Sequence, residues 1–327
     1  MSFTVWGGRN ITVAMETMQK TGFRKPSLIA GWVGAALLLV AGAYGVYWTA
    51  MANGLQAGIE RWAVAQRDKG VHVAFGEIAV GGFPFRIRAV VTDPALSKQE
   101  ARGTWTWRGP KMTLSTRPWE ISQGHLKAPG RHQFTVERGD ETRTLDLTAG
   151  ALDLVLIQGE AASRPPEMRI TAKNLSYHPQ PVAGLGGLTE SLDLRIEAPG
   201  GLPRTMNSGD VTVWRDNGGT VEIRRLEVHH GPLDIDGDGT MALDRDLQLE
   251  AAFSLRVRGF REAVDALRAA GVIRAQAAET VKTVLSMLAA GQGGERLKVP
   301  LSVQDGRFYI GPLAVGRIPT VQWPAGR

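Results

Sequence analysis

Apolar and polar residues alternate one for one along much of the chain after residue 70, and this pattern constrains the fold more than any other feature. The longest run extends from Leu247 to Val257, where every second residue is apolar and residues such as Gln248 and Glu250 stand between them. Shorter runs of the same kind lie at residues 71–75, 85–91, 145–149, 152–156, 192–196, 297–303 and 308–310. Successive side chains of a β-strand point to opposite faces, so each run predicts a strand with one buried face.

Short glycine-containing turn signals separate these runs and predict that consecutive strands pair antiparallel. They occur at Asn217–Gly219, Gly237–Gly239 and Asp305-Gly306, and the Asp-Gly step of the last favours a tight hairpin. Strands joined in this way form a meander instead of a parallel sheet with helical crossovers. The predicted fold is therefore mainly β, of the α+β class, with one or more large curved antiparallel sheets.

One long segment departs from the strand pattern. Between Phe260 and Ala290 the chain is rich in alanine, and its apolar residues recur at helical spacing in two groups separated by Gly271. This predicts a pair of helices, inserted near the C-terminal part of the chain, that covers a sheet. The Pro- and Gly-rich stretch Pro179–Gly187 suggests a weaker boundary, which would divide the strands into subdomains 71–180 and 188–327.

The segment Leu28–Trp48 carries no charge and is long enough to cross a bilayer as a helix, which takes about 20 residues. Basic residues before it, at Lys20, Arg24 and Lys25, predict that residues 1–27 form a cytoplasmic tail and that the rest is exported. The alternative is a cleavable signal peptide, because Ala50-Met51-Ala52 follows the pattern of a cleavage site. The apolar core of a signal peptide takes only about 7–15 residues, so a retained single-pass anchor is the better prediction.

Residues 49–70, directly after the anchor, have the pattern of an amphipathic helix. Leu55, Ile59 and Trp62 recur at helical spacing, and Gly70 ends the pattern. Two interpretations are open: the helix lies on the bilayer surface, or it packs as a lid on the exported domain.

Composition narrows the classes of function. The 327-residue chain has no cysteine, which excludes disulfides, thiol nucleophiles and thiolate metal sites. Its net charge is +6, and the tail before the anchor contributes +3 of this, from four basic residues against Glu16. The remaining +3 is spread along the strands, whereas nucleic-acid binding calls for a concentrated basic patch. We therefore expect no nucleic-acid partner.

Motifs for catalysis, cofactors and metals are absent or incomplete. The sequence has no G-x-S-x-G, no phosphate-binding loop, no H-E-x-x-H and no dinucleotide fingerprint, so we expect no catalytic residues and no cofactor. Residues Asp234–Gly239 match the first half of a calcium loop, but Arg245 stands at the twelfth position, where a bidentate glutamate is needed. Solvated carboxylates are the better interpretation, and no metal site is expected.

A dense local signal is the run Gly82, Phe83, Pro84, Phe85, Arg86. Pro84 fixes its own backbone and disfavours a helical conformation for Phe83, while glycine permits a sharp bend, so the run separates two strands. The two phenylalanines have three possible roles: they anchor a corner of the core, they form the apolar rim of a ligand site, or they dip into a bilayer.

This run, placed soon after a membrane anchor and a short helix, resembles the hallmark of the domain of unknown function 2125 family of bacterial envelope proteins. The C-terminal order also fits: residues 239–244, an alternating strand, a helical pair, then an Asp-Gly turn and Gly311-Pro312. The resemblance covers most of the chain after residue 28. It implies an architecture and a location, the bacterial inner membrane with a periplasmic C-terminal domain, but no activity. More loosely, the C-terminal pattern is similar to AsmA-like envelope proteins, whose curved sheets form apolar grooves associated with lipid handling.

The leading hypothesis for function is a non-catalytic envelope protein that binds or passes on a lipid in an apolar groove of its sheet. Membrane lipid would be its partner, together with other envelope proteins. The first alternative is a structural or protein-interaction scaffold, and the second is a hydrolytic enzyme with a polar cleft. The candidate ligand surface consists of one-sided strand residues and two neighbouring indoles, which suit a core as well as a groove edge: Trp105, Trp107, Leu249, Phe253 and Leu255.

Overall fold

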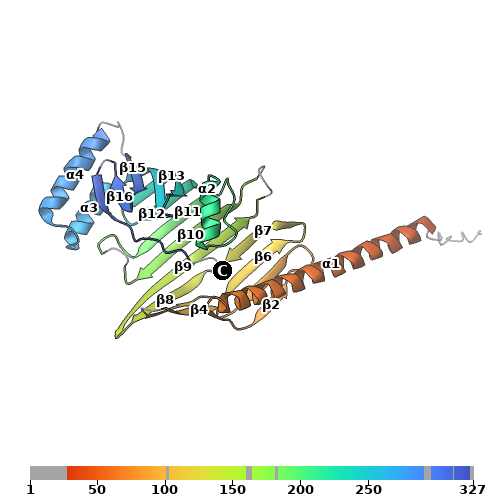
Figure 1. Ribbon diagram of the computed structural model, residues 1–327. Helices are drawn as coiled ribbons and strands as arrows, with labels where there is room; N and C mark the ends of the chain where they lie inside the picture. The colour runs from red at the N-terminus through yellow and green to blue at the C-terminus, as the bar shows by residue number, and fades with distance from the viewer. Residues whose placement is uncertain are drawn as a thin grey trace, which may run out of the picture. The chain divides into compact units, whose positions relative to one another are not determined.

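The computed structural model describes residues 28–100, 103–159, 164–180, 183–290, 296–311 and 313–324. The chain divides between Tyr47 and Trp48 into two compact units, and the second contains every strand. The elements of the second unit are labelled in Figure 1.

Helix α1 extends without interruption from Leu28 to Arg67. It joins the predicted membrane segment and the predicted amphipathic segment into one helix, in spite of the glycines at positions 54 and 58. The part from Trp32 onward is long and apolar enough to cross a membrane. The boundary between the two units falls inside this helix, so its C-terminal part, from Trp48, belongs to the β-rich unit.

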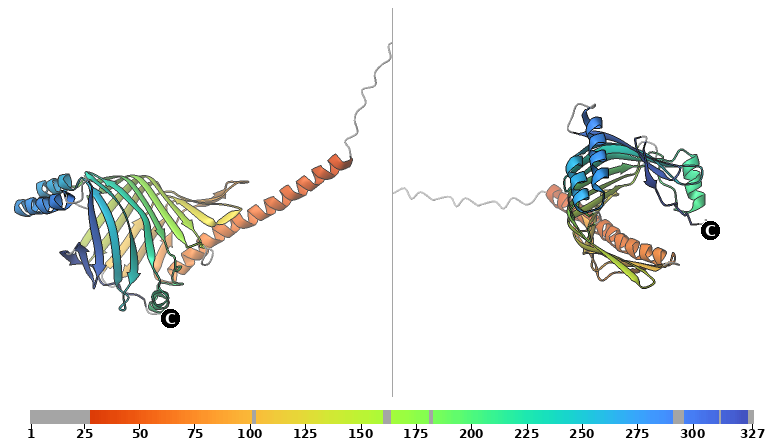
Figure 2. Two further views of the ribbon diagram at one scale, coloured as in Figure 1. Left: turned by 90° about the horizontal axis from the view of Figure 1, so that it is seen from above. Right: turned by 90° about the vertical axis from the view of Figure 1, so that its left-hand side faces the viewer.

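Within the described residues, seventeen strands form one antiparallel sheet, which confirms the predicted fold class. Figure 2 shows that the strands follow one another around a curve. The predicted helical pair is also confirmed, as α3 (Phe260–Ala269) and α4 (Ala275–Ala290) between β14 and β15. The strands are β1 (Val71–Ala74), β2 (Ile78–Gly81), β3 (Ile87–Val91), β4 (Ala95–Glu100), β5 (Gly103–Arg108), β6 (Met112–Arg117), β7 (Glu120–Lys127), β8 (Gly130–Arg138), β9 (Glu141–Ile157), β10 (Glu167–His178), β11 (Leu188–Glu197), β12 (Val221–His230), β13 (Leu233–Leu243), β14 (Leu249–Arg258), β15 (Leu297–Gln304), β16 (Arg307–Ile310) and β17 (Leu313–Arg317).

The sheet forks at β9. The first half of this strand pairs with β8 and the second half pairs with β7, while β10 runs along its other side. One arm continues through β7, β6, β3 and β2, and the other through β8, β5, β4 and β1. Pro94, Pro110 and Pro129 lie where the chain passes from one arm to the other. Proline cannot donate to a strand ladder, so each long stretch breaks and bends at these points.

Beyond β9 the strands form a simple meander from β10 to β17. The strands on either side of Pro179–Gly187, β10 and β11, pair directly with each other. The hairpin predicted at Asp305-Gly306 is confirmed between β15 and β16, and both residues have positive φ. The turn predicted at Gly237–Gly239 is wrong, because these residues lie in the middle of β13.

The two glycines of β13 are explained by their neighbours on β14. A Cβ atom at Gly237 would collide with the side chain of Leu255, and one at Gly239 would collide with the ring of Phe253. The larger side chains of β14 therefore fill the space that the glycines leave, as aromatic residues do over glycines in other sheets. The adjoining carboxylates of Asp234 and Asp236 pair with arginines, including a 2.9 Å contact from Arg296 to Asp236.

Charged side chains cover the face of the sheet that we call the outer face. Across β10, β11 and β12, Arg195 contacts Glu167 at 3.0 Å and Glu197 at 2.9 Å, and Arg224 contacts Glu197 at 2.7 Å. The hydrogen bond from Arg224 holds the pKa of Glu197 below its ordinary value, and the charges of Arg224 and Arg195 act in the same direction against burial. These cross-strand pairs help to fix the register.

The lowered pKa of Glu197 predicts an effect of acid on stability. A carboxyl group whose folded-state pKa is depressed stabilises the fold above its ordinary pKa, and this contribution is lost as the pH falls through the folded value. We expect the unfolding temperature of the full-length protein to fall below about pH 4, and to fall less in Glu197→Gln. Thermal circular dichroism across pH measures this. Glu250→Gln, at an exposed outer position of β14, is the control, and parallel curves for Glu197→Gln and the wild type would contradict the prediction.

Candidate functional site

A row of apolar side chains, interrupted at Gly237 of β13, crosses the other face of the sheet, which we call the inner face. The registers place these residues directly opposite one another from strand to strand. Leu154 of β9 faces Ile170 of β10, Ile170 faces Leu194 of β11, and Leu194 faces Leu226 of β12. The row continues in both directions, through Leu114 and Leu126 on one side and through Leu255 and Val299 on the other. The inner face is therefore one continuous apolar surface.

Much of this surface is only half-buried. The side chains of Leu154, Ile170, Leu194 and Leu226 keep part of their surface exposed, and Leu156 is exposed outright. Among the described residues, the largest side chains that are fully buried are Ile87, Leu297, Val211 and Pro118. A sheet normally buries its apolar face against a second layer of protein. In the described part of this chain, the second layer covers the inner face only in places.

One covered place lies under the C-terminal part of α1, on the concave side of the sheet (Figure 2). Here α1 and both arms of the fork enclose a cavity of about 570 Å³, which we call the α1 cavity. A volume of about 300–1,000 Å³ is typical of sites for small organic ligands. The lining is almost wholly apolar: Gly54, Leu55, Gly58, Ile59, Trp62, Val73, Ala74, Phe75, Val91, Pro94, Ala95, Leu96, Trp107, Met112, Leu114 and Leu126.

Two glycines of α1 make the space in this cavity. Gly54 and Gly58 are one helical turn apart, so they lie on the same side of the helix, and both line the cavity. A Cβ atom added at either position would meet no atom within 4 Å apart from the neighbouring residues and backbone of its own helix. Glycine in a helix costs up to about 1 kcal/mol relative to alanine, so these residues weaken the helix where they widen the cavity.

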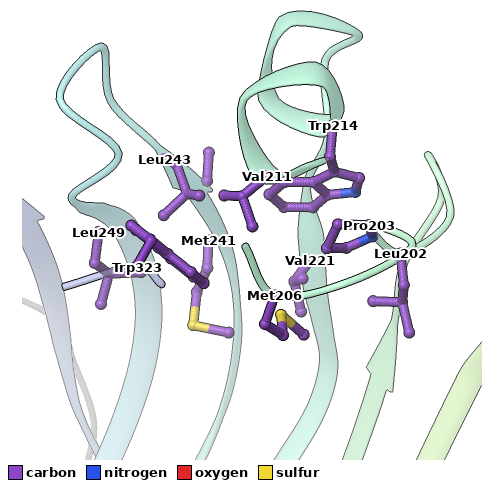
Figure 3. Close-up of a pocket in the computed structure, with 11 residues that line it drawn as sticks. Leu202, Pro203, Met206, Val211, Trp214, Val221, Met241, Leu243, Leu249 and Trp323 are labelled. Atoms are coloured by element: carbon purple, nitrogen blue, oxygen red, sulfur yellow. The ribbon is translucent and has the colours of Figure 1, made fainter. Parts of the chain in front are cut away.

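A second, smaller cavity lies near the other side of the curve, under helix α2 (Ser208–Asp216). It measures about 180 Å³, and α2, the preceding loop, strands β12 to β14 and the C-terminal segment surround it. Figure 3 shows Trp214 and Val211 of α2 among the side chains that line this cavity, together with Trp323 and Leu249. The indole N–H groups of Trp214 and Trp323 donate to the carbonyl oxygens of Gly201 and Leu247, at 2.9 and 2.8 Å. Their rings are therefore left to line an apolar space.

In the described part of the chain, several polar groups of the inner face have partners within the protein. Oγ1 of Thr189 lies 2.8 Å from Nδ1 of His230 and donates to the hydroxyl of Tyr177 at 3.2 Å. The buried His132 stacks on Trp107, with Nε2 2.9 Å from the carbonyl oxygen of Ala128. No group of three or more His, Asp or Glu residues within the described ranges is placed to hold a metal ion.

All five residues of the candidate ligand surface lie on the inner face. Trp107 lines the α1 cavity and Leu249 lines the smaller cavity under α2, while Trp105, on the same side of β5 as Trp107, faces Val136. Phe253 and Leu255 face Leu301 and Val299 across the β14–β15 pair. These residues belong to one continuous surface, but they are spread from one side of the curve to the other instead of forming a single pocket.

The Gly82–Arg86 run forms the loop between β2 and β3. Trp48 of α1 donates from Nε1 to the carbonyl oxygen of Arg86 at 3.0 Å, and its ring meets that of Phe83 edge to face at 5.5 Å between centroids. Phe83 and Phe85 are both exposed, so the core-corner interpretation does not describe them. Gly82 has a φ of +106°, which glycine adopts readily, and a Cβ atom there would collide with the backbone of Arg86.

Some residues that line the two cavities were not predicted from the sequence. Gly54 and Gly58 carried a usable signal, because two glycines one turn apart on the apolar side of an amphipathic helix indicate a gap. Trp214 and Trp323 carried none, since α2 and the C-terminal segment come together only in the folded sheet.

The fold and the site define an open, single-sheet antiparallel protein whose apolar inner face is partly covered by helices. The chain belongs to a family described as an uncharacterized protein conserved in bacteria (DUF2125), whose model matches residues 48–201 and 140–319. The match confirms the predicted family. No curated protein and no solved structure matched the chain.

Proposed function

We propose that this protein is a single-pass envelope protein that holds the acyl chains of a membrane lipid against the inner face of its sheet, and that it is not an enzyme. Its N-terminus would be cytoplasmic and its β-rich unit periplasmic, tethered to the bacterial inner membrane by residues 28–48.

The observation that carries the proposal is the half-exposed apolar row at the centre of the inner face. Leu154, Ile170, Leu194 and Leu226 have neighbours within the sheet and stay half-exposed, and they line neither of the two cavities that the described helices cover. Burial of hydrocarbon is favourable by about 0.8 kcal/mol for each CH₂ group. An acyl chain laid across this row would supply the apolar layer that a sheet of this kind ordinarily receives from protein.

The tether supports the choice of a membrane lipid over a soluble amphiphile. Helix α1 is long and apolar enough to span a bilayer, and it continues directly into the wall of the α1 cavity. An acyl chain leaving the bilayer would otherwise have to cross water. Because one continuous helix joins the cavity to the bilayer, the acyl chain would have a shorter path through water.

The test is photocrosslinking of the full-length protein in bacterial cells. Benzoylphenylalanine in place of Ile170 puts a photoreactive group on the inner face, and the same group in place of Thr171 puts it on the outer face of the same strand. We expect light to attach phospholipid at position 170 and several-fold less at position 171, as read by mass spectrometry of the intact protein. Equal lipid attachment at both positions, or none at position 170 in a folded protein, would refute the proposal.

One observation favours the second candidate, a protein-interaction scaffold. The connection between α3 and α4 carries the exposed Val272, and α4 carries the exposed Val281 and Met287, the last of them 69% exposed. An exposed apolar patch of this kind often marks a protein interface. Benzoylphenylalanine in place of the exposed Met287 tests this candidate, and attachment of another envelope protein there, with no lipid attached at position 170, would favour it.

A further inference from the structure

Four large apolar side chains are exposed together at one end of the sheet. Phe83 and Phe85 of the β2–β3 loop are 59% and 70% exposed, and Trp119 and Ile121 at the β6–β7 hairpin are 63% and 59% exposed. The register pairs Ile87, at the start of β3, with Thr116, near the end of β6. The loop and the hairpin therefore lie side by side, and we call these four residues the apolar rim.

The rim is tied to the point where the predicted membrane segment ends. Trp48 is the last residue of that segment, and it contacts the β2–β3 loop through both the Phe83 ring and the Arg86 carbonyl oxygen. Chain continuity therefore places the loop next to the residue at which α1 would leave the bilayer, however residues 28–47 are oriented.

The chemistry of the rim matches that of a bilayer interface. Tryptophan rings are enriched at the level of the lipid headgroups, phenylalanine side chains of interfacial segments are buried at the boundary between headgroups and acyl chains, and basic side chains beside them favour anionic lipids. Arg86 and Arg88 are both exposed on the same loop and strand. Water is a poor environment for four neighbouring large apolar side chains, and exposed patches of this kind mark interaction surfaces.

We infer that the apolar rim inserts into the headgroup region of the bilayer that holds α1, so that this end of the inner face opens directly onto the membrane surface. The inference uses the proposed tether but does not require that the inner face binds lipid. The rim, which includes Phe83 and Phe85, thereby gives the protein a second contact with the membrane, next to helix α1.

The absence of cysteine from the chain permits a direct test with single-cysteine variants. Phe85→Cys, Trp119→Cys and, as control, Asp140→Cys would each carry a nitrobenzoxadiazole fluorophore in the full-length protein. Asp140 lies in the β8–β9 turn, at the opposite end of β9 from the rim. The proteins would be placed in vesicles of phosphatidylcholine with a minority of phosphatidylglycerol, with unchanged thermal unfolding required of each variant.

We expect the labels at positions 85 and 119 to emit at shorter wavelength and to be quenched several-fold more by nitroxide-bearing lipid than by aqueous iodide, with the reverse at position 140. Iodide quenching at positions 85 and 119 equal to that at 140 would overturn the inference. Protection from both quenchers would also overturn it, because the rim would then face protein. Loss of lipid crosslinking at position 170 with intact quenching at the rim would reject the lipid-binding function alone.

Discussion

Gly58→Leu, alone or combined with Gly54→Leu, is expected to reduce bound lipid by more than about tenfold while the fold stays at least as stable. The new side chains would fill the α1 cavity, because no atom lies within 4 Å of the added Cβ at either position apart from the neighbouring residues and backbone of the helix itself. Displacing two CH₂ groups of a ligand costs about 1.6 kcal/mol, which corresponds to more than tenfold in affinity. Leucine also favours the helix over glycine by almost 1 kcal/mol.

The measurement is the amount of phospholipid retained per protein and the yield of the lipid adduct at position 170. Ala57→Leu is the matched control, because Ala57 is an exposed residue of the same helical turn that does not line the cavity. A stable Gly58→Leu protein that retains as much lipid as the wild type would show that the α1 cavity is not part of the binding surface.

A second large effect is expected from Leu255→Asp on the inner face. A carboxylate placed against an acyl chain must either lose its hydration or keep water in the groove, and both outcomes cost several kcal/mol. We therefore expect recovery of lipid with the full-length protein to be lost. Leu255 is half-buried and not fully enclosed, so the sheet can accept the change by turning the carboxylate to water.

Ala252→Asp supplies the control, because Ala252 is exposed on the outer face of the same strand. Leu255→Asn keeps a similar size without a charge and is expected to lose less lipid than Leu255→Asp, which separates charge from shape. Thermal unfolding establishes that each variant is folded. Normal lipid recovery from folded Leu255→Asp would remove β14 from the proposed groove.

The sequence predicts the parts of this fold that depend on local pattern. Alternation indicates which side of β14 is apolar, and helical spacing between Phe260 and Ala290 indicates α3 and α4. Helix α2 is different, because Val211 and Val213 alternate as in a strand. Its start is fixed by Asn207, whose side chain accepts a hydrogen bond from the backbone N–H of Asp210 at 2.8 Å.

Long-range pairing lies beyond the reach of local pattern. No local pattern within residues 141–157 indicates that one half of β9 pairs with β8 and the other half with β7. The glycines of β13 resemble a turn signal in the sequence. The side chains that fill their space, Phe253 and Leu255, belong to another strand, so the local pattern does not reveal them. The same limit applies to the site: each strand shows an apolar side, but only the register joins these sides into one surface.

The fork at β9 also restricts where residues can be inserted into or deleted from such a chain. An insertion in an outer turn such as Gly139-Asp140 affects a single hairpin, whereas one extra residue within β9 shifts the register against three neighbours at once. Side chains of a strand change face with every one-residue slip, so the leucines of β9 would turn toward the charged surface. We therefore expect the fold to tolerate insertions and deletions in the outer turns of the arms but not within β9, where the arms join.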